Sequence, residues 1–314
     1  MITDCFPAQI VKQPEKEKIT LIMTGDIMLD RGVEYVIKNQ AQGNFQFPFL
    51  NIIDDIKDAD LLIGNLESLI SDKGTKVGSI YSFRADPKAI EGLVFCGFDV
   101  LTLAHNHAFD YTRLALEDTF KRLKEAGIDY VGAGFNSKEA FAPLIKEVKG
   151  KKIAFFSYTN LGPNNWKAKE DASGIAWISN EDIEKVKQDI EDAKKEADFV
   201  IVFLHAGEEY QLQPNIFQND LAKASIDAGA DLVIGHHPHV AQASEEYNGK
   251  MIFYSLGNFI FDQDFSEETM KGIIVKAVLE IPRDKNQKGL EVKEIKSIDI
   301  KINSSFQPEI DSLD

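Results

Sequence analysis

Histidines are the first residues in this 314-residue chain whose types and spacing suggest chemistry. They fall in three groups, each placed directly after an apolar run: His105 with His107, His205 alone, and His236, His237 and His239 together. Neutral imidazole is the commonest nitrogen ligand for divalent transition metals, and it also serves in acid–base catalysis. Histidines scattered over a surface would not all follow apolar runs. The pattern therefore predicts a shared metal or acid–base site.

The histidine triplet follows the apolar run 232–234 and begins after Gly235. We interpret the run as a buried strand, with Gly235 allowing a sharp turn and Pro238 stiffening the exit. If that exit is extended, His237 and His239 point to one side and can face the same ion. The alternative is a polar loop that carries histidines by chance.

Carboxylate and amide side chains follow the other apolar runs. They are Asp26, Asn65, Glu67 and Asn106. Together with the imidazoles, they suit Mn, Fe or Zn better than Ca, which prefers oxygen ligands alone. The set is large enough for a two-metal centre with a bridging carboxylate and an attacking metal-bound hydroxide. Each carboxylate could instead cap a loop or helix, and Asn106 could be a turn residue.

His107 and Asp110 are spaced so that the carboxylate can orient the imidazole if a helix begins there. A histidine held in this way, outside the metal shell, could protonate a leaving group. Asp110 could alternatively be the N-cap of the helix that follows it.

The elements that must position these residues are strands at 19–24, 60–63, 100–103, 199–204 and 231–234, each ending in a polar cluster. Helical patterns at 31–39, 48–58, 87–96, 116–123, 183–193 and 217–228 alternate with strands. Parallel strands gather ligands at their carboxyl ends, so all five clusters should meet at one edge. Residues 71–86 and 161–178 look like loops over that edge, and 271–281 and 290–302 like antiparallel strands. We expect a lead-in at 1–17, a single domain at 18–303 and a tail at 304–314.

Composition narrows the class of protein. A net charge of −16 leaves no basic stripe for nucleic acid, and an acidic polymer could bind only with the help of bound cations. The sequence shows neither a signal peptide nor an apolar run long enough to span a membrane. It also lacks a P-loop and the Gly-x-Ser-x-Gly elbow of serine esterases.

Six motifs in order give the chain a family resemblance. They are Thr-Gly-Asp-Ile-Met-Leu-Asp-Arg at 24–31, Gly-Asn-Leu-Glu at 64–67, Asn-His-Ala-Phe-Asp at 106–110, His-x-Gly-x-Glu-Tyr at 205–210, Gly-His-His-Pro-His-Val at 235–240 and Ser-Leu-Gly-Asn-Phe-Ile-Phe at 255–261. The set resembles the CapA (poly-γ-glutamate capsule biosynthesis) family of the calcineurin-like metallophosphatase superfamily. The resemblance implies an α/β fold, a four-layer α/β/β/α sandwich with two central mixed sheets.

The resemblance also implies roles. It makes Asp26 and Asn106 metal ligands, Glu67 the bridging carboxylate and His107 the group acting on the leaving group, with Asp110 beside it. The remaining ligands would be His205, His237 and His239. Residues expected to support the site or contact substrate are Asn65, Arg84, His105, Glu209, His236 and Asn258. Met28 stands where superfamily phosphatases carry a ligating histidine, so we expect one or two ions. His105 replaces a usual Asn, and Ala206 a usual Trp.

Three hypotheses about function follow from the resemblance. The leading hypothesis is a metal-dependent hydrolase acting on a phosphoester or amide in poly-γ-glutamate synthesis, with His107 as general acid. The alternative is a non-catalytic subunit that binds the polymer, and a nucleotide or phosphosugar phosphatase is a third, weaker possibility. The expected partners are an acidic polymer or a phosphorylated small substrate, and membrane-bound polyglutamate synthesis subunits. The family acts at the bacterial cell surface.

Overall fold

Two mixed β-sheets form the centre of the computed structural model, which describes residues 16–284 and 287–311. The first sheet contains, in spatial order, β18 (Pro308–Ile310), β17 (Glu291–Ile302), β16 (Lys271–Glu280), β1 (Lys18–Ile27), β2 (Leu61–Leu66), β5 (Val100–Thr102) and β6 (Asp129–Val131), with β15 (Asn258–Ile260) also paired to β1. Strands β1, β2, β5 and β6 are parallel, whereas β16, β17 and β18 run antiparallel to their neighbours.

The second sheet has the order β13 (Ser244–Tyr247), β14 (Lys250–Phe253), β12 (Leu232–His236), β11 (Phe199–His205), β9 (Lys151–Thr159) and β8 (Leu144–Val148). Its central strands β9, β11, β12 and β14 are parallel, and the two edge strands are antiparallel. The carboxyl ends of the central strands therefore lie at the same edge of this sheet.

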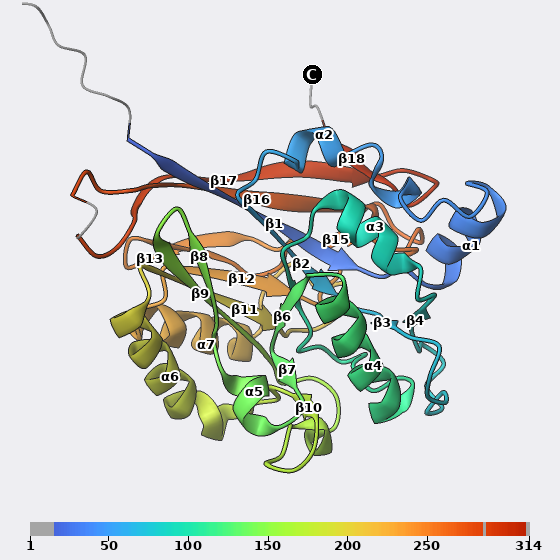
Figure 1. Ribbon diagram of the computed structural model, residues 1–314, viewed down its shortest axis with the longest axis horizontal. Coiled ribbons are helices and arrows are strands. Elements are labelled where there is room, and N and C mark those ends of the chain that lie inside the picture. Colours follow the sequence, from blue (N-terminus) through green and yellow to red (C-terminus); the bar gives the residue numbers. More distant parts are fainter. Residues whose placement is uncertain (1–15, 285–286, 312–314) are drawn as a thin grey trace, which may run out of the picture.

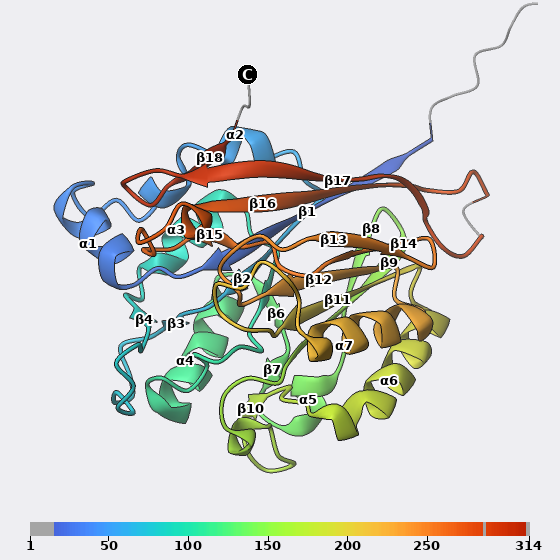
Figure 2. The same ribbon diagram turned by 180° about the vertical axis from the view of Figure 1, so that it is seen from behind.

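Helices cover the outer face of each sheet (Figures 1 and 2). Helices α1 (Arg31–Asn39), α3 (Ala89–Cys96) and α4 (Thr112–Glu125) share a core with the first sheet, and α6 (Ile183–Glu196) and α7 (Ile216–Asp227) share one with the second. A third core lies between the sheets. The expected four-layer α/β/β/α sandwich is confirmed. Shorter elements are α2 (Ile53–Ile56), α5 (Ser137–Phe141), β3 (Leu69–Ile70), β4 (Arg84–Ala85), β7 (Ala133–Gly134) and β10 (Gly174–Ile175).

Strand β11 shows how the sequence produces this layering. All seven of its residues are buried. Successive strand side chains point to opposite faces, so Phe199, Ile201 and Phe203 pack between the sheets while the residues between them pack against the helices. Two buried faces require an uninterrupted apolar run, which is what the sequence has at 199–204. The first polar residue, His205, then falls at the carboxyl end.

Two details differ from expectation, and a third expectation is not tested. Pro48 lies in the first turn of a 3-10 helix at Phe47–Phe49, where its missing amide is tolerated, and α2 begins only at Ile53. The expected C-terminal tail at 304–314 contains β18, which pairs with β17, so the first sheet extends beyond residue 303. Most of the expected lead-in, residues 1–15, lies outside the described residues.

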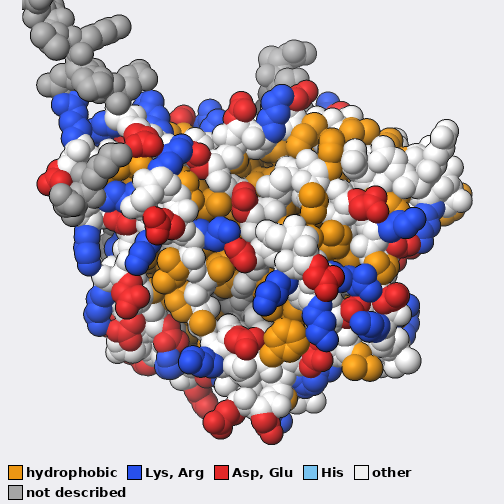
Figure 3. All heavy atoms as spheres, in the orientation of Figure 1, with side chains coloured by type: hydrophobic (Ala, Val, Ile, Leu, Met, Phe, Trp, Pro, Cys, Tyr) orange, Lys and Arg blue, Asp and Glu red, His pale blue; other side chains and the backbone are white. Residues whose placement is uncertain are grey.

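Acidic and basic side chains are interspersed on the face seen in Figure 3, and neither sign forms a continuous region there. Within the described ranges, every helix is too short or too polar to cross a lipid bilayer.

Candidate metal centre

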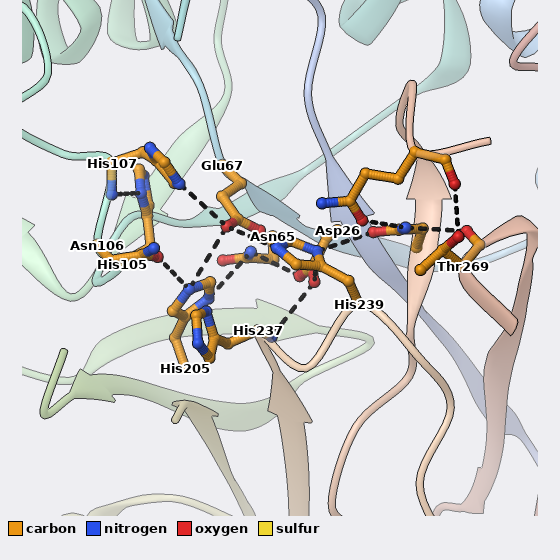
Figure 4. A network of polar contacts seen from close by, with 12 residues as sticks. Asp26, Asn65, Glu67, His105, Asn106, His107, His205, His237, His239 and Thr269 are labelled. Carbon is orange, nitrogen blue, oxygen red and sulfur yellow. Dashed lines mark hydrogen bonds and ion pairs between the residues drawn. The ribbon is translucent and has the colours of Figure 1, made fainter. Parts of the chain in front are cut away.

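Strand ends from both sheets bring a cluster of buried polar side chains together (Figure 4). The first sheet supplies Asp26 at the end of β1, Glu67 directly after β2 and Asn106 beyond β5. The second sheet supplies His205 at the end of β11 and His237 and His239 beyond β12. The clusters therefore meet as predicted, but they come from the strand ends of two sheets and not from one edge of a single sheet.

Glu67 lies at the centre of the cluster. Its Oε1 is 3.6 Å from His239 Nε2, 3.7 Å from His205 Nε2 and 3.9 Å from His107 Nε2. Glu67 belongs to two groups whose donor atoms all lie within 4.8 Å of one another: Glu67, His237 and His239, and Asp26, Glu67 and His205. A carboxylate common to two donor groups has the placement of a bridging ligand.

The Glu67 carboxylate is completely buried, and neither oxygen has a hydrogen-bond partner among the residues that the structure describes. Leaving a buried charged group unsatisfied is costly, so such groups are normally paired or bound to metal. His237 Nδ1 is likewise buried without a partner. These orphaned atoms, in a set of imidazole nitrogens and carboxylate oxygens, fit a divalent transition metal.

Burial controls the protonation of the cluster. Burial, and next the charge of Asp26, raise the pKa of Glu67 well above its ordinary value. Burial lowers the pKa of His237 to about 3, and burial with the nearby His237 lowers the pKa of His205 well below its usual range. Near neutral pH both imidazoles are thus held neutral, which is the state in which histidine binds metal.

Asp26 behaves differently from Glu67. Burial acts to raise its pKa, but hydrogen bonding with His239 and the charges of His236 and His239 outweigh burial, and the pKa is lowered. Asn65 Nδ2 also donates to Asp26 Oδ1 at 2.8 Å. Asp26 is therefore held as a carboxylate beside Glu67.

Amide side chains orient the cluster. Thr102 Oγ1 donates to Asn65 Oδ1 at 2.8 Å, which turns the Asn65 amide nitrogen toward Asp26. Asn258 Oδ1 lies 3.0 Å from His239 Nδ1, and Asn106 Oδ1 lies 2.8 Å from His205 Nε2. Such contacts fix the ring orientation of ligating histidines. Asn65 and Asn258 thus contact Asp26 and His239, two of the residues for which the resemblance implied ligand roles.

His107 and Asp110 form the pair that their spacing predicted. His107 Nδ1 lies 2.7 Å from Asp110 Oδ2, so Nε2 is left facing Glu67. Asp110 Oδ2 also accepts from the backbone amide of Phe83 at 2.8 Å. Helix α4 begins at Thr112 with Tyr111 as its N-cap, so the N-cap alternative for Asp110 is not observed.

The route of the chain past His236 differs from expectation. Gly235 lies within β12 and is not among the positive-φ residues; a Cβ there would lie 1.9 Å from the Tyr254 carbonyl oxygen. The glycine is thus needed for close backbone approach rather than for a turn. The exit is not extended either, because His237 and His239 have φ values of +97° and +58°.

The remaining predicted residues lie around the cluster or away from it. His105 and His236 are buried behind the ligand set, with His105 Nδ1 accepting from His107 N and His236 Nε2 lying 3.1 Å from the Thr24 carbonyl oxygen. Arg84 lies in a different place, because it donates to the Lys73 and Gly74 carbonyl groups and packs over Tyr111.

Met28 is fully buried in the core between the first sheet and its helices. Its sulfur accepts a hydrogen bond from the Asp30 amide at 3.1 Å. At the position where the resemblance noted a missing histidine, the chain therefore has a side chain that packs in the core.

A cavity of about 410 Å³ is lined by Asn106, His107 and His239 of the cluster. Its other lining residues include the predicted Glu209 and a group that sequence reasoning missed, namely Arg31, Tyr81, Phe83, Trp166, Tyr210, Asp262, Gln263 and Phe265. Tyr81 and Phe83 belong to the expected loop at 71–86, and Trp166 to that at 161–178. Both loops therefore border the site as expected, but predicting the loops did not show which of their side chains line the cavity.

Comparison with known proteins decides the family. The model of the bacterial capsule synthesis protein family PGA_cap matches residues 20–263. The chain belongs to this family. A PGA_cap relative, the capsule biosynthesis protein CapA of Bacillus anthracis, is 37% identical over 82% of the chain and 63% of its own length. The PGA biosynthesis protein CapA of Bacillus subtilis is 35% identical over 82% of the chain and 67% of its own length. The chain thus spans about two thirds of these relatives.

A third relative is the probable polyglutamine synthesis accessory protein of Mycobacterium tuberculosis, 25% identical over 78% of the chain and 75% of its own length. Among solved structures, a phosphatase from Mycoplasma pneumoniae aligns with TM-score 0.53 and 18% identity, covering 91% of this chain and 95% of that one. A putative 5'-nucleotidase from Staphylococcus aureus aligns with TM-score 0.54 and 16% identity, covering 94% of this chain and 56% of that one. At these identities the likeness shows that the PGA_cap chain has the metallophosphatase fold.

Proposed function

We propose that this chain is a metal-dependent hydrolase of the CapA type that acts in poly-γ-glutamate capsule synthesis, on a phosphoester or an amide. The observation that carries the proposal is Glu67, a buried carboxylate common to two donor groups and without a hydrogen-bond partner in the described part of the chain. The family and the names of its CapA relatives support the capsule context.

The residues that would hold Mn, Fe or Zn are Glu67 with His237 and His239, and Asp26 with Glu67 and His205. Asn106 Oδ1 lies against His205 Nε2 and can add an amide oxygen. A divalent ion bound there would supply a Lewis acid and lower the pKa of a water molecule. The donor atoms come from the ends of rigid strands, which keeps their arrangement fixed before substrate arrives.

His107 is the residue we assign to proton transfer. Asp110 occupies Nδ1, so a proton on Nε2 faces the cluster and can be donated to the leaving oxygen or nitrogen. The Phe83 ring packs against the imidazole at a centroid distance of 4.1 Å and against Phe261 at 5.8 Å. These apolar contacts exclude water from one side of the imidazole and limit its rotation.

A second candidate function is a non-catalytic accessory subunit that binds acidic polymer through bound cations. The packing of Met28 into the core favours it, because that position offers no ligand to a metal. The relative named as an accessory protein of polyglutamine synthesis also favours it. In either case the expected setting is the bacterial cell surface, with membrane-bound synthesis subunits as partners.

The test is a turnover screen of the Mn-, Fe- or Zn-loaded protein on phosphoesters and γ-glutamyl amides, with His107→Gln alongside. General acid catalysis contributes about 10²- to 10⁴-fold, so the variant should lose activity in that range while it keeps its metal, since His107 belongs to neither donor group. Turnover that is insensitive to His107→Gln would contradict the assigned mechanism. Metal-dependent polymer binding without turnover would favour the accessory role.

A further inference from the structure

Arg31 is the only Lys or Arg side chain among the described residues that line the cavity beside the metal centre. Three carboxylates line the same space: Asp110, Glu209 and Asp262. A run of negative charges would be repelled by this lining. A single anionic group placed at Arg31 would not be repelled, because it would contact the one cationic Lys or Arg side chain among the described lining residues.

Two contacts hold the Arg31 guanidinium in place. Its Nε donates to Asp262 Oδ2 at 3.0 Å and its Nη2 donates to Asp262 Oδ1, so the pair is bidentate. Its Cζ lies 4.9 Å from the centroid of the Phe83 ring. Nη1 has no protein acceptor within residues 16–284 and 287–311, which leaves donors of the planar fork for another oxyanion.

The backbone at Arg31 is also unusual. Its φ of +52° lies in the left-handed region, which a residue other than glycine rarely adopts. Asp30 Oδ1 accepts from the Arg31 amide and Asp262 Oδ2 accepts from the Gly32 amide, both at 2.8 Å. Strained backbone held in place by its surroundings is typical of functional positions.

Phe83 connects Arg31 to the proposed proton donor. The ring that carries the guanidinium also contacts the His107 imidazole at 4.1 Å, and the Phe83 amide donates to the same Asp110 oxygen that accepts from His107. The guanidinium and the imidazole therefore contact one aromatic ring. Arg31 and His107 also line the same cavity, so a group bound at Arg31 would share that cavity with the proposed proton donor.

We propose that Arg31 binds one anionic group of the substrate, a carboxylate or a phosphate, with Asp262 and Phe83 as positioning residues. This inference rests on the proposed function and specifies its substrate as a chain end or a small anionic molecule. Polymer lying through the cavity along its length would place several carboxylates against Glu209 and Asp110.

The test is isothermal titration calorimetry with two probes, glutarate for a carboxylate and inorganic phosphate for a phosphate. Titrations of the Mn-loaded protein and of the protein in chelator separate the contribution of Arg31 from that of the metal. Arg31→Gln should weaken binding of the preferred probe by about tenfold or more in both states. A tenfold change in Kd corresponds to about 1.4 kcal/mol. Arg31→Lys should retain part of the affinity because it keeps the charge but loses the fork.

The matched control is Arg122→Gln, which removes an arginine that also pairs with aspartates but lies on α4 outside the cavity lining. It should leave both affinities unchanged. A second measurement needs no variant: in the wild-type chain the bound probe should protect Arg31 from phenylglyoxal and leave Arg122 reactive. That readout holds even where Arg31→Gln fails to fold.

Several results would overturn the proposal. They are binding of neither probe by the wild type, equal affinities in wild type and Arg31→Gln, or absence of Arg31 protection. A γ-linked glutamate hexamer that binds much more tightly than glutarate would overturn the restriction to one anionic group. If the metal-hydrolase proposal is wrong, the protein should bind no metal or show no turnover. Binding of the probe at Arg31 would still be measurable in chelator, so the two failures can be told apart.

Discussion

Replacing Glu67 with methionine should stabilise the metal-free protein and abolish its stabilisation by metal. Glu67 is fully buried with both oxygens lacking hydrogen bonds to described residues, and its pKa is raised by burial and by Asp26. Methionine has a similar volume, so Glu67→Met removes the unsatisfied group without leaving a large cavity. In an ordinary core position a substitution would instead cost stability.

The magnitude follows from the desolvation penalty. An unsatisfied buried polar group costs about 1–3 kcal/mol, so Glu67→Met should gain roughly that amount in chelator. With unfolding entropy of about 2.1 cal/mol/K per residue, 314 residues give a melting-temperature increase of about 1.5 °C per kcal/mol, or about 2–5 °C. At a metal concentration near 100 times Kd, the wild type should gain about 2.7 kcal/mol for each ion bound, and the variant should gain nothing.

The assay is thermal unfolding of both proteins, in chelator and with added Mn²⁺. Met23→Leu, a volume-conserving change in the core between the sheets, serves as control and should keep the metal-induced shift. If Glu67→Met melts below the wild type in chelator and still responds to Mn²⁺, Glu67 is not an unsatisfied metal ligand and the reasoning fails.

Two other predictions concern protonation. Asp110→Asn should lower kcat by about 10- to 100-fold, because His107 loses its orienting partner. The control is Asp118→Asn, which changes an equally buried aspartate on α4 outside the cavity lining and should leave kcat unchanged. Equal effects of the two substitutions on kcat would contradict the role assigned to Asp110. In chelator, the free energy of unfolding should fall as pH drops below 6.5. Burial lowers the pKa values of His105 and His237 to about 3, so the unfolded state binds protons that the folded state cannot, at about 2.7 kcal/mol per pH unit for the two. The raised pKa of Glu67 works in the opposite direction and offsets part of this loss down to about pH 4.5. Chemical denaturation between pH 7 and 4.5 measures the net change in the free energy of unfolding. A free energy of unfolding that stays constant or rises toward pH 4.5 would contradict the prediction.

The sequence was sufficient to predict the strands that carry the site. The run at 199–204 is apolar because both faces of β11 are buried, and its first polar residue is His205 at the carboxyl end. The same pattern located Asp26, Glu67 and His237. Parallel pairing aligned the strand ends within each sheet, and the packing of the two sheets against each other then brought the two sets together.

Other features depend on tertiary contacts that carry no local signal. Arg31 and Asp262 are 231 residues apart and meet only because β15 pairs with β1 and brings residue 262 against the start of α1. The left-handed backbone at His237 and His239 was not predicted, because histidine adopts positive φ more often than most residues but still only in a small minority of cases. Gly235 was expected to form a turn because close approach of the Tyr254 carbonyl cannot be read from one strand alone.

Metal content of the purified protein, measured by elemental analysis alongside His237→Ala, tests the central claim most directly. The two donor groups predict two equivalents of Mn, Fe or Zn in the wild type. His237→Ala should keep about one, because the group of Asp26, Glu67 and His205 is left intact. A wild-type protein that holds no metal even after reconstitution, or a variant that holds as much as the wild type, would contradict the account.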